Sequence, residues 1–300
     1  MNSQIAGLVT GGPAFPQRFS IEATRPSDSE IDALAAIVPP GTPVYLTAVP
    51  TVGDRELAAA AARLRQVGLE PVAHIAARRL AGVSQWRDLL RALRGEADMR
   101  RLLVIGGDVD ASGPFADARA LIQKGGLREA GIEEIGIGGY PEGHPRIPAG
   151  RLEAAIDEKI AAARAGGLRV HIVSQFSFAP EAVVGWLTRL RVCGITVPVQ
   201  VGIAGPASLT GLLRYARRCG VNTAMRGLTS GVAIGLAGHA SPGNAQVVSD
   251  RLLAALTAAQ GIVDAAPHYF SFGGVLPTAR YACEAAAGRT TGGHAMARSN

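Results

Sequence analysis

Polar side chains with acid–base chemistry follow two short apolar runs near the middle of the chain. The motif Gly106-Gly107-Asp108 follows the run 102–105, and the motif Gly139-Tyr140-Pro141-Glu142-Gly143-His144-Pro145 follows the run 135–137. A carboxylate or histidine can exchange protons, and a loop bounded by glycine and proline can present side chains to a ligand. Because sites of parallel α/β folds form just past the strand ends, we expect both motifs to border one site.

Further polar residues lie at or just past the ends of other predicted strands: Glu22, Thr47, His74 and Gln175. Core packing would favour apolar residues at such positions. In a barrel the carboxyl ends of all strands meet at one mouth, so these side chains are expected to converge there.

Each of these residues also has a plainer interpretation. Glu22 is either a solvated strand-end carboxylate or a partly buried acid with a raised pKa that delivers a proton. His74 is either a hydrogen-bonded core histidine or a ligand contact. His74 and His144 with a nearby carboxylate would be an alternative metal site, but their spacing is not that of a metal motif, and we predict no metal.

The elements that position these residues alternate regularly. Strands are predicted at 18–24, 43–49, 70–75, 102–105, 135–137, 170–173, 198–203 and 268–272. Helices are predicted at 27–38, 55–67, 83–94, 114–123, 151–165, 180–192, around Tyr215, at 245–259 and at 277–287, with 227–243 irregular. Eight such units over 300 residues predict an α/β fold, a (β/α)8 TIM barrel, as a single domain over 17–288. We expect an N-terminal arm over 1–16 and a disordered tail over 289–300.

A doubly wound parallel sheet is the alternative architecture. Its dinucleotide fingerprint would need a third glycine that opens a helix, whereas Gly136-x-Gly138 continues into Tyr-Pro-Glu. The fingerprint therefore gives the alternative little support.

The composition limits the partners. The net charge is +6, almost all from arginine, but no long basic run occurs and aromatics are only 5%, so we predict no nucleic-acid partner. An anionic small molecule accounts for the arginines equally well. The three cysteines are widely spaced, which suits a reducing cytoplasm, and neither a signal peptide nor a membrane-length apolar run is visible.

The chain resembles the methylenetetrahydrofolate reductase family over most of its length. The Tyr-Pro-Glu-x-His-Pro string is the most specific element, and Gly107-Asp108 lies one strand earlier. Arg18-Phe19-Ser20-Ile21-Glu22 occupies the place of the family's first-strand Ser-Phe-Glu, and Ser174-Gln175-Phe176 resembles its Thr-Gln-Phe/Leu. The string 194–199 and Pro267-His268-Tyr269-Phe270 match the regions of strands seven and eight.

The resemblance implies an FAD-dependent oxidoreductase of one-carbon metabolism that interconverts 5,10-methylenetetrahydrofolate and 5-methyltetrahydrofolate. It implies Glu22 as general acid or base and Asp108 as a second catalytic residue. The implied cofactor-binding residues are Thr47, His74, Gly107, Asp108, Ala116, Tyr140, Glu142, His144 and Lys159. The implied folate-binding residues are Glu22, Asp108, Gln175 and Tyr215. From the residues alone, Lys159 would be a solvated helix cation and Tyr215 a core aromatic.

Four positions depart from the family pattern, and they bear on the contacts of the flavin phosphate, the nicotinamide and the folate tail. The family's arginine before Gly-Asp is Gly106, its aromatic after the second-strand threonine is Ala48, and its helix-seven glutamine and eighth-strand arginine are Gly211 and Gly274. We therefore expect tetrahydrofolate derivatives as partners and poor use of NAD(P)H, with methyltetrahydrofolate oxidation favoured. A flavin-free barrel methyltransferase, a catalytically silent folate- or flavin-binding subunit and a homo-oligomer stay open as alternatives.

Overall fold

The computed structural model describes residues 17–49, 52–110, 113–208, 211–212, 215, 243–259 and 264–289. The predicted arm over 1–16, the irregular segment 227–242, the bounds of the helix around Tyr215 and the tail beyond Arg289 lie outside the described residues.

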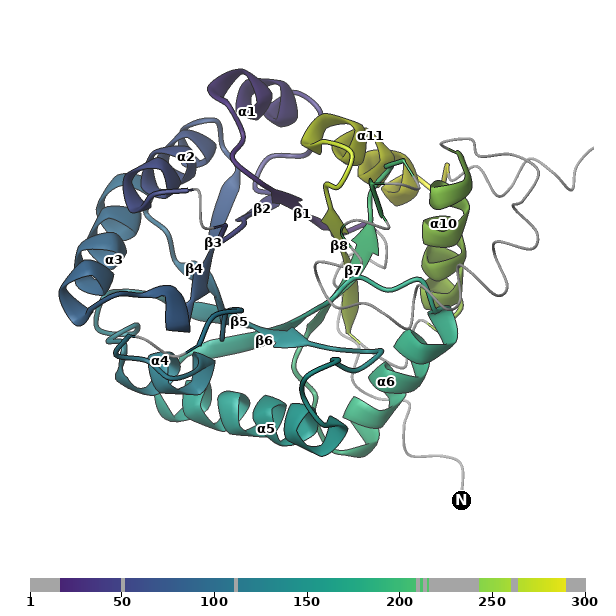
Figure 1. Cartoon of the computed structure of the whole chain (residues 1–300). Coiled ribbons are helices and arrows are strands. Elements are labelled where there is room, and N and C mark those ends of the chain that lie inside the picture. Colours follow the sequence, from purple (N-terminus) through teal and green to yellow (C-terminus); the bar gives the residue numbers. More distant parts are fainter. Residues whose placement is uncertain are drawn as a thin grey trace, which may run out of the picture.

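Eight parallel strands close into a barrel in sequence order (Figure 1). They are β1 Ser20–Ala23, β2 Pro43–Leu46, β3 Glu70–Ala76, β4 Arg101–Ile105, β5 Glu134–Gly139, β6 Arg169–Ser174, β7 Val199–Ala204 and β8 Ala265–Phe270. The barrel closes because β1 pairs with β8, with Ser20 opposite His268. This closure confirms the (β/α)8 barrel and excludes the doubly wound sheet.

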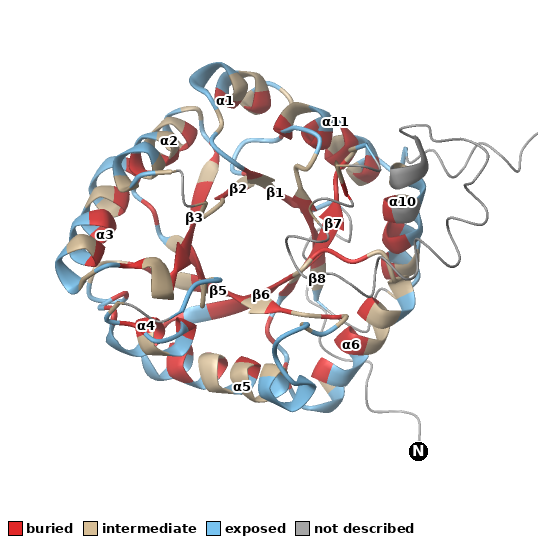
Figure 2. Cartoon of the chain, in the orientation of Figure 1, coloured by how far each residue is buried: buried red, intermediate tan, exposed pale blue. Residues whose placement is uncertain are grey.

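Helices surround the barrel on its outer face (Figure 1). They are α1 Asp28–Ala35, α2 Asp54–Gln66, α3 Val83–Ala97, α4 Ala118–Lys124, α5 Ala149–Ala165, α6 Pro180–Val192, α10 Gly243–Ala258 and α11 Val275–Ala286. Their buried residues face the strands and their exposed residues face outward (Figure 2). This one-sided burial is the amphipathic pattern from which the helices were predicted.

Some predicted element ends were wrong for identifiable reasons. The fourth helix begins at Ala118 rather than 114, because the Asp117 side chain accepts a hydrogen bond from Ala120 N–H and caps it there. Strand β8 begins at Ala265 rather than 268, because Ala265, Ala266 and Pro267 pair with β7 although none has a strong strand propensity. A short 3-10 helix, η1 Ala77–Arg79, was not predicted.

The inside of the barrel is more polar than the layer between strands and helices. A small apolar cluster of Tyr45, Val72, Leu103 and Val173 fills part of it, and His74, His171 and His268 are buried beside it. A Cβ on Gly136 would lie 2.8 Å from His171 Nε2, so the glycine leaves the room that this imidazole occupies. The interior therefore carries titratable groups within a packed barrel.

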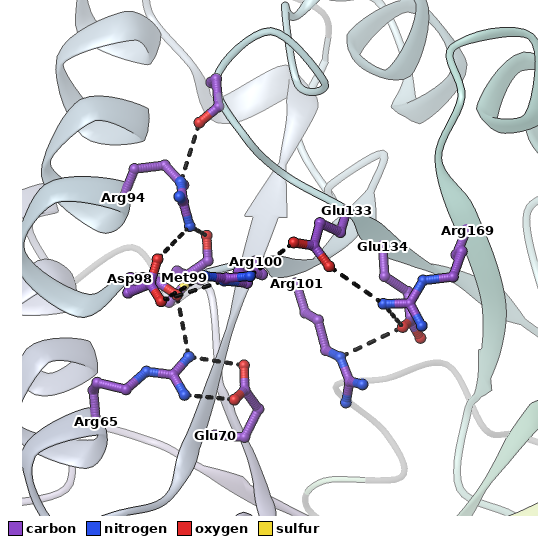
Figure 3. Close-up of polar contacts among 11 residues, drawn as sticks. Arg65, Glu70, Arg94, Asp98, Met99, Arg100, Arg101, Glu133, Glu134 and Arg169 are labelled. Atoms are coloured by element: carbon purple, nitrogen blue, oxygen red, sulfur yellow. Dashed lines mark hydrogen bonds and ion pairs between the residues drawn. The ribbon is translucent and has the colours of Figure 1, made fainter.

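Ion pairs gather at the end of the barrel where β3 to β6 begin (Figure 3). Arg65 contacts both carboxylate oxygens of Glu70 at 2.6 and 2.9 Å, and Glu134 lies 3.4 Å from both Arg101 and Arg169. Such partly exposed pairs contribute modestly to stability. They lie where the strands start, so they belong to the end away from the predicted site.

Candidate functional site

Glu22 is a buried acid inside the mouth of the barrel. Its side chain is 13% exposed, and Oε2 lies 3.4 Å from His268 Nε2 and 3.9 Å from His74 Nε2. Burial raises the pKa of this carboxyl above its usual 4.5, and the nearby His74 opposes the shift only in part. Of the two interpretations of Glu22, the structure supports the buried acid with a raised pKa.

A chain of hydrogen-bonding groups holds His268 beside Glu22. His268 Nδ1 lies 2.8 Å from Ser20 Oγ, and Ser20 Oγ donates to Gln200 Oε1 at 3.3 Å. The neutral tautomer of His268 donates from one ring nitrogen and accepts at the other. Its Nε2 therefore either accepts a hydrogen bond from a protonated Glu22 or donates one to an ionised Glu22. Burial lowers the pKa of His268 to about 3, which agrees with this neutral tautomer.

His74 is also neutral and lacks a partner for one ring nitrogen. Burial lowers its pKa to about 4, although the adjacent Glu22 favours its charged form. Within the described part of the chain, its buried Nε2 has no hydrogen-bond partner. Its side chain also lines a pocket of about 480 Å³ between the ends of β2, β3 and β4, together with Thr47, Ala48, Arg78, Arg79 and Val109. A buried nitrogen at a pocket wall can accept or donate a hydrogen bond to a ligand.

The β5 loop brings three predicted cofactor residues together. The rings of Tyr140 and His144 pack edge to face at 5.3 Å. Lys159, on α5, directs Nζ to the carbonyl of Gly138 at 3.5 Å, and the Tyr140 hydroxyl packs over the same glycine. Lys159 is partly buried, and burial lowers its pKa to about 8, so it is not a fully solvated cation. The loop and α5 thus present an aromatic ring, an imidazole and a buried ammonium at one strand end.

Other predicted residues already have partners in the protein. Asp108 is exposed and pairs with Arg79, with Arg79 Nη2 2.5 Å from Asp108 Oδ1. Glu142 accepts a hydrogen bond of 2.5 Å from Ser177, which ties the β5 and β6 loops together. Thr47 donates to Thr24 at 2.7 Å. Gly107 has a φ of +90°, which only glycine adopts readily, and Ala116 is an exposed residue two positions before α4.

An aromatic cluster lines the β6–β8 side of the mouth. Tyr215 stacks on Phe272 with ring centroids 4.5 Å apart, and Phe270 stacks on Phe272 at 5.5 Å. His268 packs against Phe270 at 5.1 Å, which connects the cluster to the Glu22 side of the mouth. Gln175 accepts a hydrogen bond through Oε1 from the following backbone N–H. These flat rings form a surface on which a planar heterocycle can stack.

Sequence reasoning missed the buried polar residues Ser20, Tyr45, His171 and His268 and the half-buried Gln200. The Tyr45 hydroxyl oxygen lies 2.9 Å from His171 Nε2, and Nδ1 of the same imidazole lies 2.8 Å from Glu134 Oε1. The available signal was a polar residue flanked by apolar ones inside a strand, as in Val170-His171-Ile172. Alternation alone does not say whether such a residue points into the barrel or toward the helices.

Two searches of the described residues gave negative results. No helix among them is long and apolar enough to cross a membrane. No group of three or more histidine, cysteine, aspartate or glutamate side chains there is arranged to hold a metal ion.

Comparisons with known proteins find one family whose model matches and solved structures that share the fold. The model of a family described as methylenetetrahydrofolate reductase matches residues 28–226. An uncharacterised protein from Clostridium thermocellum that binds two copies of 5-methyl-5,6,7,8-tetrahydrofolic acid is 12% identical, with 91% of this chain and 94% of that chain covered and a TM-score of 0.59. Dihydropteroate synthase from Thermus thermophilus is 18% identical, with 91% of this chain and 93% of that chain covered and a TM-score of 0.51.

Proposed function

The chain belongs to the methylenetetrahydrofolate reductase family, and from this premise we propose that it is an FAD-dependent oxidoreductase that interconverts 5,10-methylenetetrahydrofolate and 5-methyltetrahydrofolate. Family membership and a structural neighbour that binds methyltetrahydrofolate support a folate-related function. The observation that carries the proposal is the buried Glu22, whose pKa is raised by burial and whose Oε2 lies 3.4 Å from Nε2 of the neutral His268.

Glu22 is the proposed general acid. To become reducible, the one-carbon bridge of methylenetetrahydrofolate must open, and the departing nitrogen must gain a proton. A carboxyl whose pKa is raised by burial stays protonated nearer neutral pH than an ordinary glutamate and can deliver that proton. In the reverse direction the same oxygen takes the proton back. His268, Ser20 and Gln200 orient the carboxyl for either direction.

The residues at the β4 and β5 ends fit a flavin. Lys159 is a buried ammonium whose single hydrogen bond with the described residues is a long one, so it has donors left for an anionic or carbonyl oxygen. Tyr140 and His144 offer ring faces and edges beside it, and His74 offers its unpartnered nitrogen. Gly107, Asp108 and Ala116 complete the proposed cofactor contacts. FAD, when bound there, would supply the hydride chemistry, while the protein positions and tunes it.

The aromatic cluster is the proposed pterin surface. Tyr215 and Phe272 provide stacked rings, and Gln175 provides an amide at the end of β6. A pterin has a planar ring with donors and acceptors on its edge, so this combination suits it.

The absorption spectrum of the purified protein tests the proposal. A flavin band at about 450 nm that bleaches anaerobically on addition of methyltetrahydrofolate is expected for the oxidoreductase. A protein that takes up no FAD, yet binds methyltetrahydrofolate, would instead support the flavin-free methyltransferase or a silent binding subunit.

A further inference from the structure

We propose that the pocket between the ends of β2, β3 and β4 is a subsite for an anionic group, phosphate or carboxylate, carried by the ligand that reaches Glu22. The pocket has a volume of about 480 Å³, within the range of small-molecule sites. The inference rests on the proposed function, because it assigns a ligand class to one side of the same site.

The first support is Arg78, which lines this pocket from η1. Its guanidinium donates to the carbonyl oxygen of Gly107, and its buried Nε has no hydrogen-bond partner in the part of the chain that the structure describes. Arg78 also forms no ion pair with any described carboxylate, unlike its neighbour Arg79. A partly buried guanidinium without a counterion is suited to a bidentate anion.

The second support is the position of the Arg78 guanidinium beside Gly106. A Cβ at this glycine would have the Arg78 guanidinium as its nearest neighbour, with Nη1 at 3.7 Å and Cζ at 3.8 Å. Arg78 therefore places a guanidinium directly beside the strand end at which residue 106 itself carries no side chain. The positive charge at this place is that of Arg78 on η1, which follows β3, and not that of a residue at the end of β4.

The other charged residues of the lining already have partners in the protein. Arg79 also lines it but is paired with Asp108 and donates to the carbonyl oxygen of Ala48 at 3.0 Å. The carboxylate among the lining residues, Asp54, accepts a hydrogen bond from Gln85 at 2.8 Å. Arg78 is therefore the lining arginine whose charge no described carboxylate offsets through an ion pair.

The other residues that line the pocket indicate what kind of ligand would carry the anionic group. His74 lines the pocket and lies 3.9 Å from Glu22, so the pocket borders the acid. Val49, Leu57 and Ile75 add an apolar wall. A ligand with an apolar or aromatic body and an anionic group fits this lining. The diphosphate of a dinucleotide and the carboxylates of a polyglutamylated folate share that chemistry.

Two affinity ratios distinguish the sources. Calorimetry would give the affinity for FAD relative to riboflavin, and for methyltetrahydrofolate triglutamate relative to its monoglutamate, in the wild type, Arg78→Gln and Arg87→Gln. Arg87 is an exposed arginine of α3, so its variant loses the same charge outside the pocket. Arg78→Gln is expected to lower one ratio about tenfold to hundredfold, as for a lost charge-assisted hydrogen bond. Arg87→Gln should leave both ratios within about twofold.

A fall in the FAD ratio identifies the dinucleotide as the anion source, and a fall in the triglutamate ratio identifies the folate tail. Unchanged ratios in Arg78→Gln overturn the subsite. If circular dichroism shows that Arg78→Gln does not fold, Val52→Asp places a negative charge at another lining residue and should cause the same fall. If neither flavin nor folate binds any variant, the proposed function fails. Inorganic pyrophosphate then tests the subsite alone, and equal affinity for Arg78→Gln and the wild type overturns it.

Discussion

The Oε2 atom of Glu22 lies 3.4 Å from Nε2 of His268, although 246 residues separate them in the chain. The contact exists because β1 pairs with β8 where the barrel closes, with Ser20 opposite His268. Ser20 contacts Nδ1 on the far side of the imidazole, which leaves Nε2 facing the Glu22 carboxyl. Closure of the barrel thus assembles the proposed proton donor.

Replacing Glu22 by glutamine removes the proposed acid with little change in size. Glu22→Gln should retain FAD and lose folate turnover by about 100-fold or more, the usual cost of removing a general acid. Steady-state kinetics and the flavin spectrum measure the two effects. Glu96→Gln, at an exposed acid on α3, is the matched control. Turnover close to wild type in Glu22→Gln would reject Glu22 as the acid.

The histidine pKa values predict how stability depends on pH. The folded-state pKa of His74 is about 4, below its usual 6.5, so the unfolded chain binds the proton more readily. The stability that the folded state gains from keeping His74 neutral is fully present above pH 6.5 and is lost as the pH falls through about 4. The melting temperature should therefore fall less between these two pH values in His74→Asn than in the wild type. Equal slopes in both proteins would contradict the assignment of a neutral, buried His74.

Lys159 should affect flavin retention. Lys159→Gln removes a buried ammonium beside Tyr140 and His144, and FAD affinity should fall about tenfold or more with the loss of a charge-assisted hydrogen bond. Tyr140→Ala and His144→Ala should weaken retention in the same direction. Lys124→Gln, at the exposed end of α4, is the control. Fluorescence of FAD released on dialysis measures the loss, and full occupancy in all three site variants would indicate a structural loop.

The electron donor is the subject of a further prediction. Ala48 and Gly106 replace an aromatic ring and a guanidinium of the family pattern, so we expect slow flavin reduction by NADH and NADPH and faster reduction by methyltetrahydrofolate. Anaerobic stopped flow, with each reductant mixed separately, follows the bleaching of the flavin band. Rapid bleaching by either nucleotide at micromolar concentration would restore the ordinary reductive direction.

Gly136 tests the packing of the barrel interior. A Cβ added there would lie 2.8 Å from His171 Nε2 and 3.0 Å from Leu103, so Gly136→Ala should destabilise the fold by about 1–3 kcal/mol through overpacking. Gly150→Ala is the control, because a Cβ at that helical position meets no atom within 4 Å. Urea unfolding gives both free energies. Equal stability of the two variants would show that the interior has room around His171.

Local sequence patterns determined most of the fold. The alternation of apolar runs with amphipathic segments predicted the eight strands, and the Ser27 and Glu30 side chains form the capping box that starts α1. The ends of these strands also identified Glu22 and the β5 loop. These features depend on residues close together in the chain, so they can be read without knowing the tertiary structure.

The tertiary structure alone decided which groups meet. His268 reaches Glu22 only through closure of the barrel, Lys159 is buried because α5 packs beside the end of β5, and Arg78 lies beside Gly106 from a neighbouring strand connection. The physical reason is the stagger of the barrel strands, which sets which inward-facing positions share a level. Burial then raises the pKa of Glu22 and lowers the pKa of His268, and no local pattern encodes these shifts.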